Sequence, residues 1–222
     1  MSHTTPATVR GRRARQAAIG RSVEVLPSAE VMHRNLLDTL AGASPDAEAE
    51  GSAWYLAAHS IAADIADRHG LSLAQAAGVI AALSPQCGWA ENVRLADQAA
   101  ADGTASGHTA DACRKADAIL AGADPFEVLG GRKVRSFYSN IVRPTTAGAV
   151  TVDRHAVDML VGRRGAVEDR VLERIGAYAR CAAVIRGVAR DLGMRPHEVQ
   201  AVAWVAWRQV HDVAYRYDLT DL

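Results

Sequence analysis

Hydrophobic positions along most of the chain recur three or four residues apart, which places them on one face of an α-helix. Helices are predicted over residues 27–40, 54–69, 72–84, 90–101, 110–121, 133–142, 153–161, 168–192 and 196–215. An alternating β-pattern is limited to residues 149–152. The pattern therefore predicts an all-α fold.

Residues typical of helix ends support these boundaries. Ser72 and Gln75 form an S-x-x-Q capping box ahead of an apolar run, and Gly70 suits the end of the preceding helix. Residues 42–51, rich in Ser, Pro and acids, are predicted to form a loop. Gly78 inside an apolar run predicts a close helix approach.

The segment from Val128 to Leu160 carries the main candidate chemistry. Gly130, Gly131, Arg132 and Lys133 open one predicted helix, and Asp153 is predicted as the N-cap of the next. A helix over 133–142 is about 15 Å long, and the following ten residues can extend about 33 Å, so the chain can return. Lys133 and Asp153 can therefore lie at neighbouring helix starts.

An ammonium and a carboxylate held together beside a nucleic-acid backbone suit chemistry at a glycosidic bond. The alternative is a surface lysine and an ordinary capping aspartate. The sequence S-P-Q-C-G-W-A-E-N-V places Gln86, Trp89 and Asn92 at the start of another helix, as binding residues or as a turn with a buried tryptophan. Trp204 and Trp207 are expected in the core, with base stacking as the alternative.

The number and distribution of charged residues bear on whether the protein binds nucleic acid. Twenty-five basic and twenty-five acidic residues balance, so net charge does not indicate nucleic acid. Residues 10–21 and 132–143 are nevertheless basic without an acid, which fits a small DNA footprint or a solvated helix face. Residues 1–21 are predicted to form a disordered basic arm.

The three cysteines, Cys87, Cys113 and Cys181, have no metal-binding or disulfide spacing, so no metal and no cofactor are predicted. No apolar run is long enough for a membrane span, and a cytoplasmic location is expected. The oligomeric state stays open.

Three sequence blocks follow one another along the chain in the order that a known superfamily also shows: G-V-I-A-A-L-S-P-Q-C-G-W-A-E-N-V, L-G-G-R-K-V and V-T-V-D-R-H-A-V-D-M-L. Together they resemble the helix-hairpin-helix DNA glycosylase superfamily, most closely the endonuclease III type, over roughly residues 72–162. The resemblance implies two helical lobes with a cleft between them. It places residues 22–71 and 143–222 in a terminal lobe and 72–142 in a middle lobe that ends in a shortened hairpin.

The resemblance also implies residue roles. Lys133 falls on the family's nucleophilic lysine, Asp153 on its catalytic aspartate, and Gln86 on the residue that fills space near an extruded base. Arg132 or Arg135 would be the neighbouring cation that favours an uncharged amine. The N–H groups of Gly130 and Gly131 would hold a phosphate.

Other positions depart from the family pattern or leave two interpretations open. Arg154 replaces a threonine and adds a cation beside Asp153, and the four-cysteine iron–sulfur loop is absent. Trp89 and Tyr138 are candidates to stack on a flipped base, or else they pack in the core. His155 and Asp158 are candidates to line the cleft, or else they lie at the surface or in the core.

The predicted function is a DNA glycosylase, with or without lyase activity at abasic sites, that acts on a base extruded from double-stranded DNA. One alternative is a glycosylase-like transferase that attaches an amine or amino acid to an activated hydroxymethyl-pyrimidine in DNA. The other is a non-enzymatic, DNA-binding helical module.

Overall fold

The computed structural model describes residues 26–146, 148–165 and 171–211, and all regular structure within them is helical, which confirms the all-α prediction. The predicted basic arm, residues 1–21, lies outside these residues. In chain order the elements are α2 (Ala29–Ala41), α3 (Pro45–His69), α4 (Leu73–Leu83), α5 (Trp89–Asp102), α6 (Ala110–Leu120), α7 (Pro125–Val128), α8 (Arg132–Val142), α9 (Arg154–Val161), the 3₁₀ turn η1 (Val171–Glu173), α10 (Ala177–Leu192) and α11 (Pro196–Val210).

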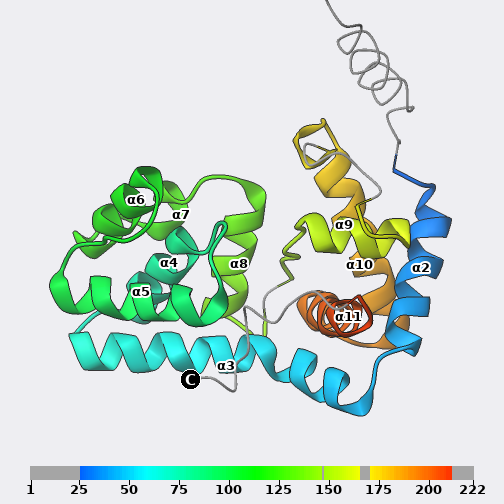
Figure 1. Ribbon diagram of the computed structural model, residues 1–222, viewed down its shortest axis with the longest axis horizontal. Helices are drawn as coiled ribbons and strands as arrows, with labels where there is room; N and C mark the ends of the chain where they lie inside the picture. Colours follow the sequence, from blue (N-terminus) through cyan, green and yellow to red (C-terminus); the bar gives the residue numbers. More distant parts are fainter. Residues whose placement is uncertain (1–25, 147, 166–170, 212–222) are drawn as a thin grey trace, which may run out of the picture.

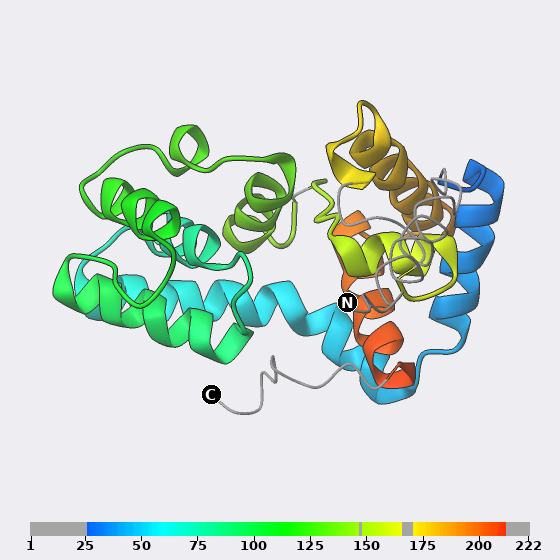
Figure 2. The same ribbon diagram turned by 45° about the horizontal axis from the view of Figure 1, so that its top comes forward.

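The helices gather into two groups, α4 to α8 on one side and α2, α9, α10 and α11 on the other (Figure 1). Each group has its own cluster of buried hydrophobic residues. Helix α3, 25 residues long, runs beneath both groups, as Figure 2 also shows. At about 1.5 Å per residue it is nearly 40 Å long, enough to reach from one cluster to the other.

The two clusters divide the chain differently from the predicted lobes in one respect. Residues 22–71 were assigned to the terminal lobe, but Trp54, Tyr55 and Ile65 of α3 pack into the cluster formed by the middle helices. Ala47, near the start of the same helix, packs instead against Val205 and Ala206 of α11. Helix α3 therefore belongs to both groups, and the division into lobes stays a prediction.

The loop predicted over residues 42–51 is wrong, because α3 begins within it. The Ser44 side chain accepts a hydrogen bond from the Ala47 backbone N–H, and Pro45 occupies the first helical position. Acidic residues follow at Asp46 and Glu48, where they complement the positive end of the helix dipole. The Ser, Pro and acids of this stretch are the residues that start a helix.

The single helix predicted over residues 168–192 is also wrong. A short 3₁₀ turn, η1, precedes α10, and Gly176 between them has a φ of 83° that interrupts helical backbone. The end signals elsewhere are confirmed. They include the Ser72–Gln75 capping box, the left-handed Gly70 after α3, Asp153 at the start of α9 and Pro196 in the first turn of α11.

Two glycines allow helices to approach closely. A Cβ at Gly51 of α3 would lie 2.6 Å from the backbone nitrogen of Val202 in α11. A Cβ at Gly78 of α4 would lie 2.8 Å from Pro125 Cβ in α7, which confirms the close approach expected at Gly78. None of the described helices is long and apolar enough to cross a membrane.

Candidate functional site

A pocket of about 310 Å³ opens where α3, α8 and α11 meet the starts of α5 and α9. Its volume is at the lower end of the roughly 300–1,000 Å³ typical of small-molecule sites. The lining residues are Trp54, Tyr55, Ser84, Gln86, Cys87, Trp89, Asn92, Lys133, Phe137, Thr151, Asp153, Arg154, His155, Gln200, Ala201 and Trp204. They come from both groups of helices, so the arrangement of those groups decides the shape of the pocket.

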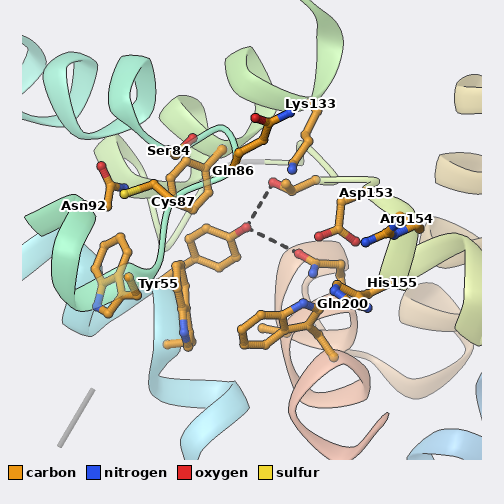
Figure 3. Close-up of a pocket in the computed structure, with 16 residues that line it drawn as sticks. Tyr55, Ser84, Gln86, Cys87, Asn92, Lys133, Asp153, Arg154, His155 and Gln200 are labelled. Carbon is orange, nitrogen blue, oxygen red and sulfur yellow. Dashed lines mark hydrogen bonds between the residues drawn. The ribbon is translucent and has the colours of Figure 1, made fainter. Parts of the chain in front are cut away.

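Lys133 and Asp153 face the same pocket from neighbouring helix starts. Lys133 lies in the first turn of α8, and the preceding N-cap residue, Gly131, has a φ of 72° that suits glycine. Asp153 caps α9, and its Oδ1 accepts a hydrogen bond of 2.8 Å from the Ala156 N–H. Figure 3 shows both side chains directed into the hollow. Within the described residues Lys133 forms no ion pair, so its exposed ammonium is accessible to a ligand.

The floor of the pocket is a buried polar network. The Tyr55 hydroxyl lies 3.0 Å from Thr151 Oγ1 and 3.3 Å from Gln200 Oε1 (Figure 3). Thr151 Oγ1 also accepts a hydrogen bond of 3.4 Å from Asn140 Nδ2. Burial raises the pKa of Tyr55 to about 12, so the phenol stays protonated at neutral pH. The floor therefore offers neutral hydrogen-bonding groups, and one of them, Thr151, lies two positions before Asp153 in the sequence.

Five aromatic side chains line the apolar part of the pocket, although aromatics make up only 5% of the chain. The ring of Trp54 is central, with centroids of Tyr55 and Trp89 at 4.9 Å, Phe137 at 5.8 Å and Trp204 at 6.4 Å. These rings are tilted or edge-on to one another, as aromatic pairs prefer. They form a continuous wall against which a flat ligand can stack.

The charges around this wall favour an electron-rich or anionic ligand. The guanidinium carbon of Arg208 lies 4.3 Å from the Trp204 ring centroid, so one indole face already holds a cation. Lys133 and Arg154 add two positive charges, and Asp153 supplies one negative charge. A cage for a quaternary ammonium group would need more negative than positive charge around its aromatic rings.

The turn between α4 and α5 forms another side of the pocket. Gln86 has a φ of 60°, the one positive value at a non-glycine residue in the described part of the chain. Such a conformation costs roughly 1–3 kcal/mol and occurs preferentially at binding sites. Burial raises the pKa of the neighbouring Cys87 thiol, which lowers its reactivity as a nucleophile.

Buried polar atoms without a hydrogen-bond partner concentrate at this pocket. Of seven such atoms in the described residues, four belong to pocket-lining side chains: Trp54 Nε1, Trp89 Nε1, Asn92 Oδ1 and His155 Nδ1. Folded proteins pair almost all buried polar groups, so a cluster of exceptions requires a specific reason. These four atoms are buried in the pocket wall, so a ligand can pair with them only if the side chains move.

The structure brings seven of the predicted site residues together in this pocket, namely Gln86, Trp89, Asn92, Lys133, Asp153, Arg154 and His155. Five others do not line it: Gly130, Gly131, Arg132, Arg135 and Tyr138. The Arg135 Nε donates to the Leu129 carbonyl at 2.7 Å, and its guanidinium carbon lies 5.0 Å from the Phe126 ring centroid. Arg135 is therefore held away from the pocket, which removes it as the cation expected beside Lys133.

Tyr138 packs against the cluster of the middle helices, and burial raises its pKa. Asp158 lies in the core, 3% exposed, and accepts a hydrogen bond from the Gly165 N–H. For both residues the packing interpretation is the one that the structure supports. Gly130 borders a smaller cavity of about 90 Å³ beside Lys115 and Val134.

The pocket also contains residues that the sequence pattern did not single out as site residues, chiefly Trp54, Tyr55, Phe137, Thr151 and Gln200. Gln200 had a detectable signal, because it is a polar residue within the apolar run V-Q-A-V-A-W and is only 6% exposed. Trp204 and Trp207 are predicted to lie in the core, with base stacking as the alternative. The structure buries Trp207 and turns Trp204 to the pocket.

Comparisons with known proteins add one relationship. No curated protein and no solved structure matches the chain. Residues 22–211, which include the whole pocket, match the model of one protein family. The chain therefore belongs to the family of unknown function DUF7178.

Proposed function

We propose that the protein is a DNA glycosylase that accepts an extruded nucleoside in this pocket and breaks its N-glycosidic bond. The observation that carries the proposal is that Lys133 and Asp153 open together onto one aromatic-lined pocket. A base inside a duplex is inaccessible to any side chain, so an enzyme must flip it out and stack it in a cleft. The wall around Trp54 supplies the stacking surface.

The chemistry requires a nucleophile and a group that accepts a proton. In this proposal the Lys133 ammonium first gives a proton to solvent, the resulting amine attacks the sugar carbon C1′, and the bond from C1′ to the base breaks. The bonding electrons leave with the base, which takes a proton from water, while the amine nitrogen gives its proton to Asp153. The Asp153 carboxylate also stabilises positive charge that develops on the sugar. Its Oδ1 is engaged by the Ala156 N–H, and the remaining oxygen serves this role.

Borohydride trapping tests the nucleophile with unusual clarity, because the chain contains two lysines, Lys115 and Lys133. Lys115 is paired with Asp111 at 2.5 Å and lies outside the pocket, so Lys115→Met is a matched control for Lys133→Met. We expect the wild type and Lys115→Met to form a covalent adduct with abasic-site DNA in borohydride. We expect Lys133→Met to form none.

Asp153→Asn tests the carboxylate separately from the helix cap. Asparagine caps a helix about as well as aspartate, so the free energy of unfolding should change little. Base release should fall by about 10²–10⁴, the range typical of general acid–base groups. If the wild type neither traps nor releases a base across a broad panel of modified DNAs, the glycosylase proposal is wrong.

One observation supports the transferase alternative. Arg154 lines the pocket beside Asp153. It takes the place of a threonine in the motif of the glycosylase superfamily that the sequence resembles. A guanidinium there suits a phosphate or pyrophosphate group, which arginine binds in a bidentate manner. Mass spectrometry of nucleosides from DNA carrying pyrophosphorylated hydroxymethyl-pyrimidine, incubated with the protein and an amine, separates the alternatives. A new amine adduct indicates transfer, and a free base indicates the glycosylase.

A further inference from the structure

The Tyr178 hydroxyl lies where the two parts of the candidate site meet. Tyr178 is in the first turn of α10, and its hydroxyl donates to the Val150 carbonyl at 2.7 Å. The same oxygen accepts from the Val152 N–H at 3.3 Å and lies 3.2 Å from Ser136 Oγ. A phenol has a single proton, so the Ser136 hydroxyl is the donor in the third contact.

The contacts with Val152 and Ser136 lie close in the sequence to the two proposed catalytic residues. Val152 immediately precedes Asp153, and Ser136 lies three residues after Lys133, one turn further along α8. One oxygen atom therefore connects the helix that carries Lys133 with the segment that carries Asp153. Tyr178 itself does not line the pocket, so it does not reach a ligand there.

The segment formed by residues 150–152 depends on such contacts. It is buried and has no regular secondary structure, so its backbone groups need partners outside a helix or a sheet. Tyr178 supplies partners for Val150 and Val152, while the Tyr55 hydroxyl contacts the Thr151 side chain from the pocket side.

We infer that Tyr178 is a positioning residue whose hydroxyl sets the separation between Lys133 and Asp153. The inference rests on the proposed function, because the separation matters only if the two residues act on one substrate. Displacement of a reacting group by about 1 Å can lower a rate by about 10²-fold. Loss of the hydroxyl should therefore affect the chemical step more than substrate binding.

The test compares Tyr178→Phe with two serine variants of α8. Ser136→Ala removes one contact of the Tyr178 hydroxyl and leaves the ring in place. Ser139→Ala is the matched control, because within the described part of the chain the Ser139 hydroxyl bonds only to the Arg135 carbonyl of its own helix. Single-turnover base release and borohydride trapping give the rate constant of the chemical step. The dependence of the steady-state rate on DNA concentration gives KM. Hydrogen exchange measures the Val152 amide directly.

We expect Tyr178→Phe to lower the rate constant about 10- to 100-fold with KM changed less than about threefold. The Val152 amide should exchange faster in this variant, while the buried helix around Met159 keeps its protection. Ser136→Ala should show a smaller loss of rate, and Ser139→Ala none. A purely structural role would lower the folded fraction, measured by circular dichroism, and would leave the rate constant per folded molecule unchanged.

The outcomes separate this inference from the proposed function. An active wild type whose Tyr178→Phe and Ser136→Ala variants keep the full rate overturns the positioning role alone. An inactive wild type overturns the proposed function and the positioning role together. If Tyr178→Phe does not fold, Ser136→Ala against Ser139→Ala decides the inference, because both variants leave the tyrosine intact.

Discussion

The contact between α3 and α11 at Gly51 leads to a quantitative prediction about stability. In Gly51→Ala the new Cβ would lie 2.6 Å from the Val202 nitrogen and closer still to the Val202 Cα. Real Cβ contacts do not fall below 3.0 Å, and these atoms belong to the backbone of another helix, so α3 and α11 must separate. Overpacking of this kind costs about 1–3 kcal/mol, and sometimes more.

A second glycine provides the control. Gly187 lies inside α10, and a Cβ there would meet nothing nearer than the end of the Arg190 side chain at 3.9 Å. Both substitutions gain about 1 kcal/mol from the better helix propensity of alanine. The overpacking cost applies only at Gly51. We therefore expect Gly187→Ala to be more stable than Gly51→Ala by about 1–3 kcal/mol.

Urea unfolding followed by tryptophan fluorescence measures this difference, and thermal unfolding should give a melting temperature gap of about 2–4 °C per kcal/mol. Because Gly51 lies one turn before Trp54 and Tyr55, its substitution should also disturb the contacts of Trp54 with Trp204 and of Tyr55 with Gln200. If Gly51→Ala is as stable as Gly187→Ala, within about 0.5 kcal/mol, the close approach of these helices does not exist in solution.

Two further predictions concern single positions. Burial raises the pKa of Asp158, so the wild type should lose stability as pH rises from below the carboxyl's ordinary value of 3.8 through the raised pKa. Asp158→Asn, which can still accept from the Gly165 N–H, should therefore be more stable than the wild type at pH 7, and the gain should vanish near pH 3 in urea unfolding. An equal gain at both pH values would contradict the role of burial. Gln86→Gly relieves the positive φ of Gln86, so the free energy of unfolding should stay equal or rise by up to about 1 kcal/mol. A loss above 1 kcal/mol in calorimetry would show that the Gln86 side chain stabilises the turn.

Local sequence was sufficient for the class of fold and for most helix ends. The helical period predicted the all-α fold, and Ser72, Gly70, Asp153 and Pro196 marked boundaries that the structure confirms. These signals work because capping depends on a few neighbouring backbone groups. The loop predicted over residues 42–51 shows the limit, since Ser44 and Pro45 belong equally to a loop composition and to a helix start.

The candidate site was partly predictable for the same reason. Lys133 and Asp153 stand at helix starts that sequence signals locate, and a connection of known maximum length allowed them to meet. The aromatic wall was not predictable, because periodicity identifies the buried face of a helix without identifying its neighbour. Trp204 and Trp207 have similar sequence contexts, yet one lines the pocket and the other is buried.

Contacts between distant helices determine that difference. Three contacts illustrate this: the close approach of Gly51 to α11, the contact of Tyr55 with Gln200, and the contacts of Tyr178 with α8 and with residues 150–152. Each of them joins residues that are more than 25 positions apart in the sequence. Such contacts depend on the combined packing of all the helices, in which each side chain fits only the space that its neighbours leave. Local patterns therefore define the helices and their ends, whereas the pocket exists only once the helices have packed.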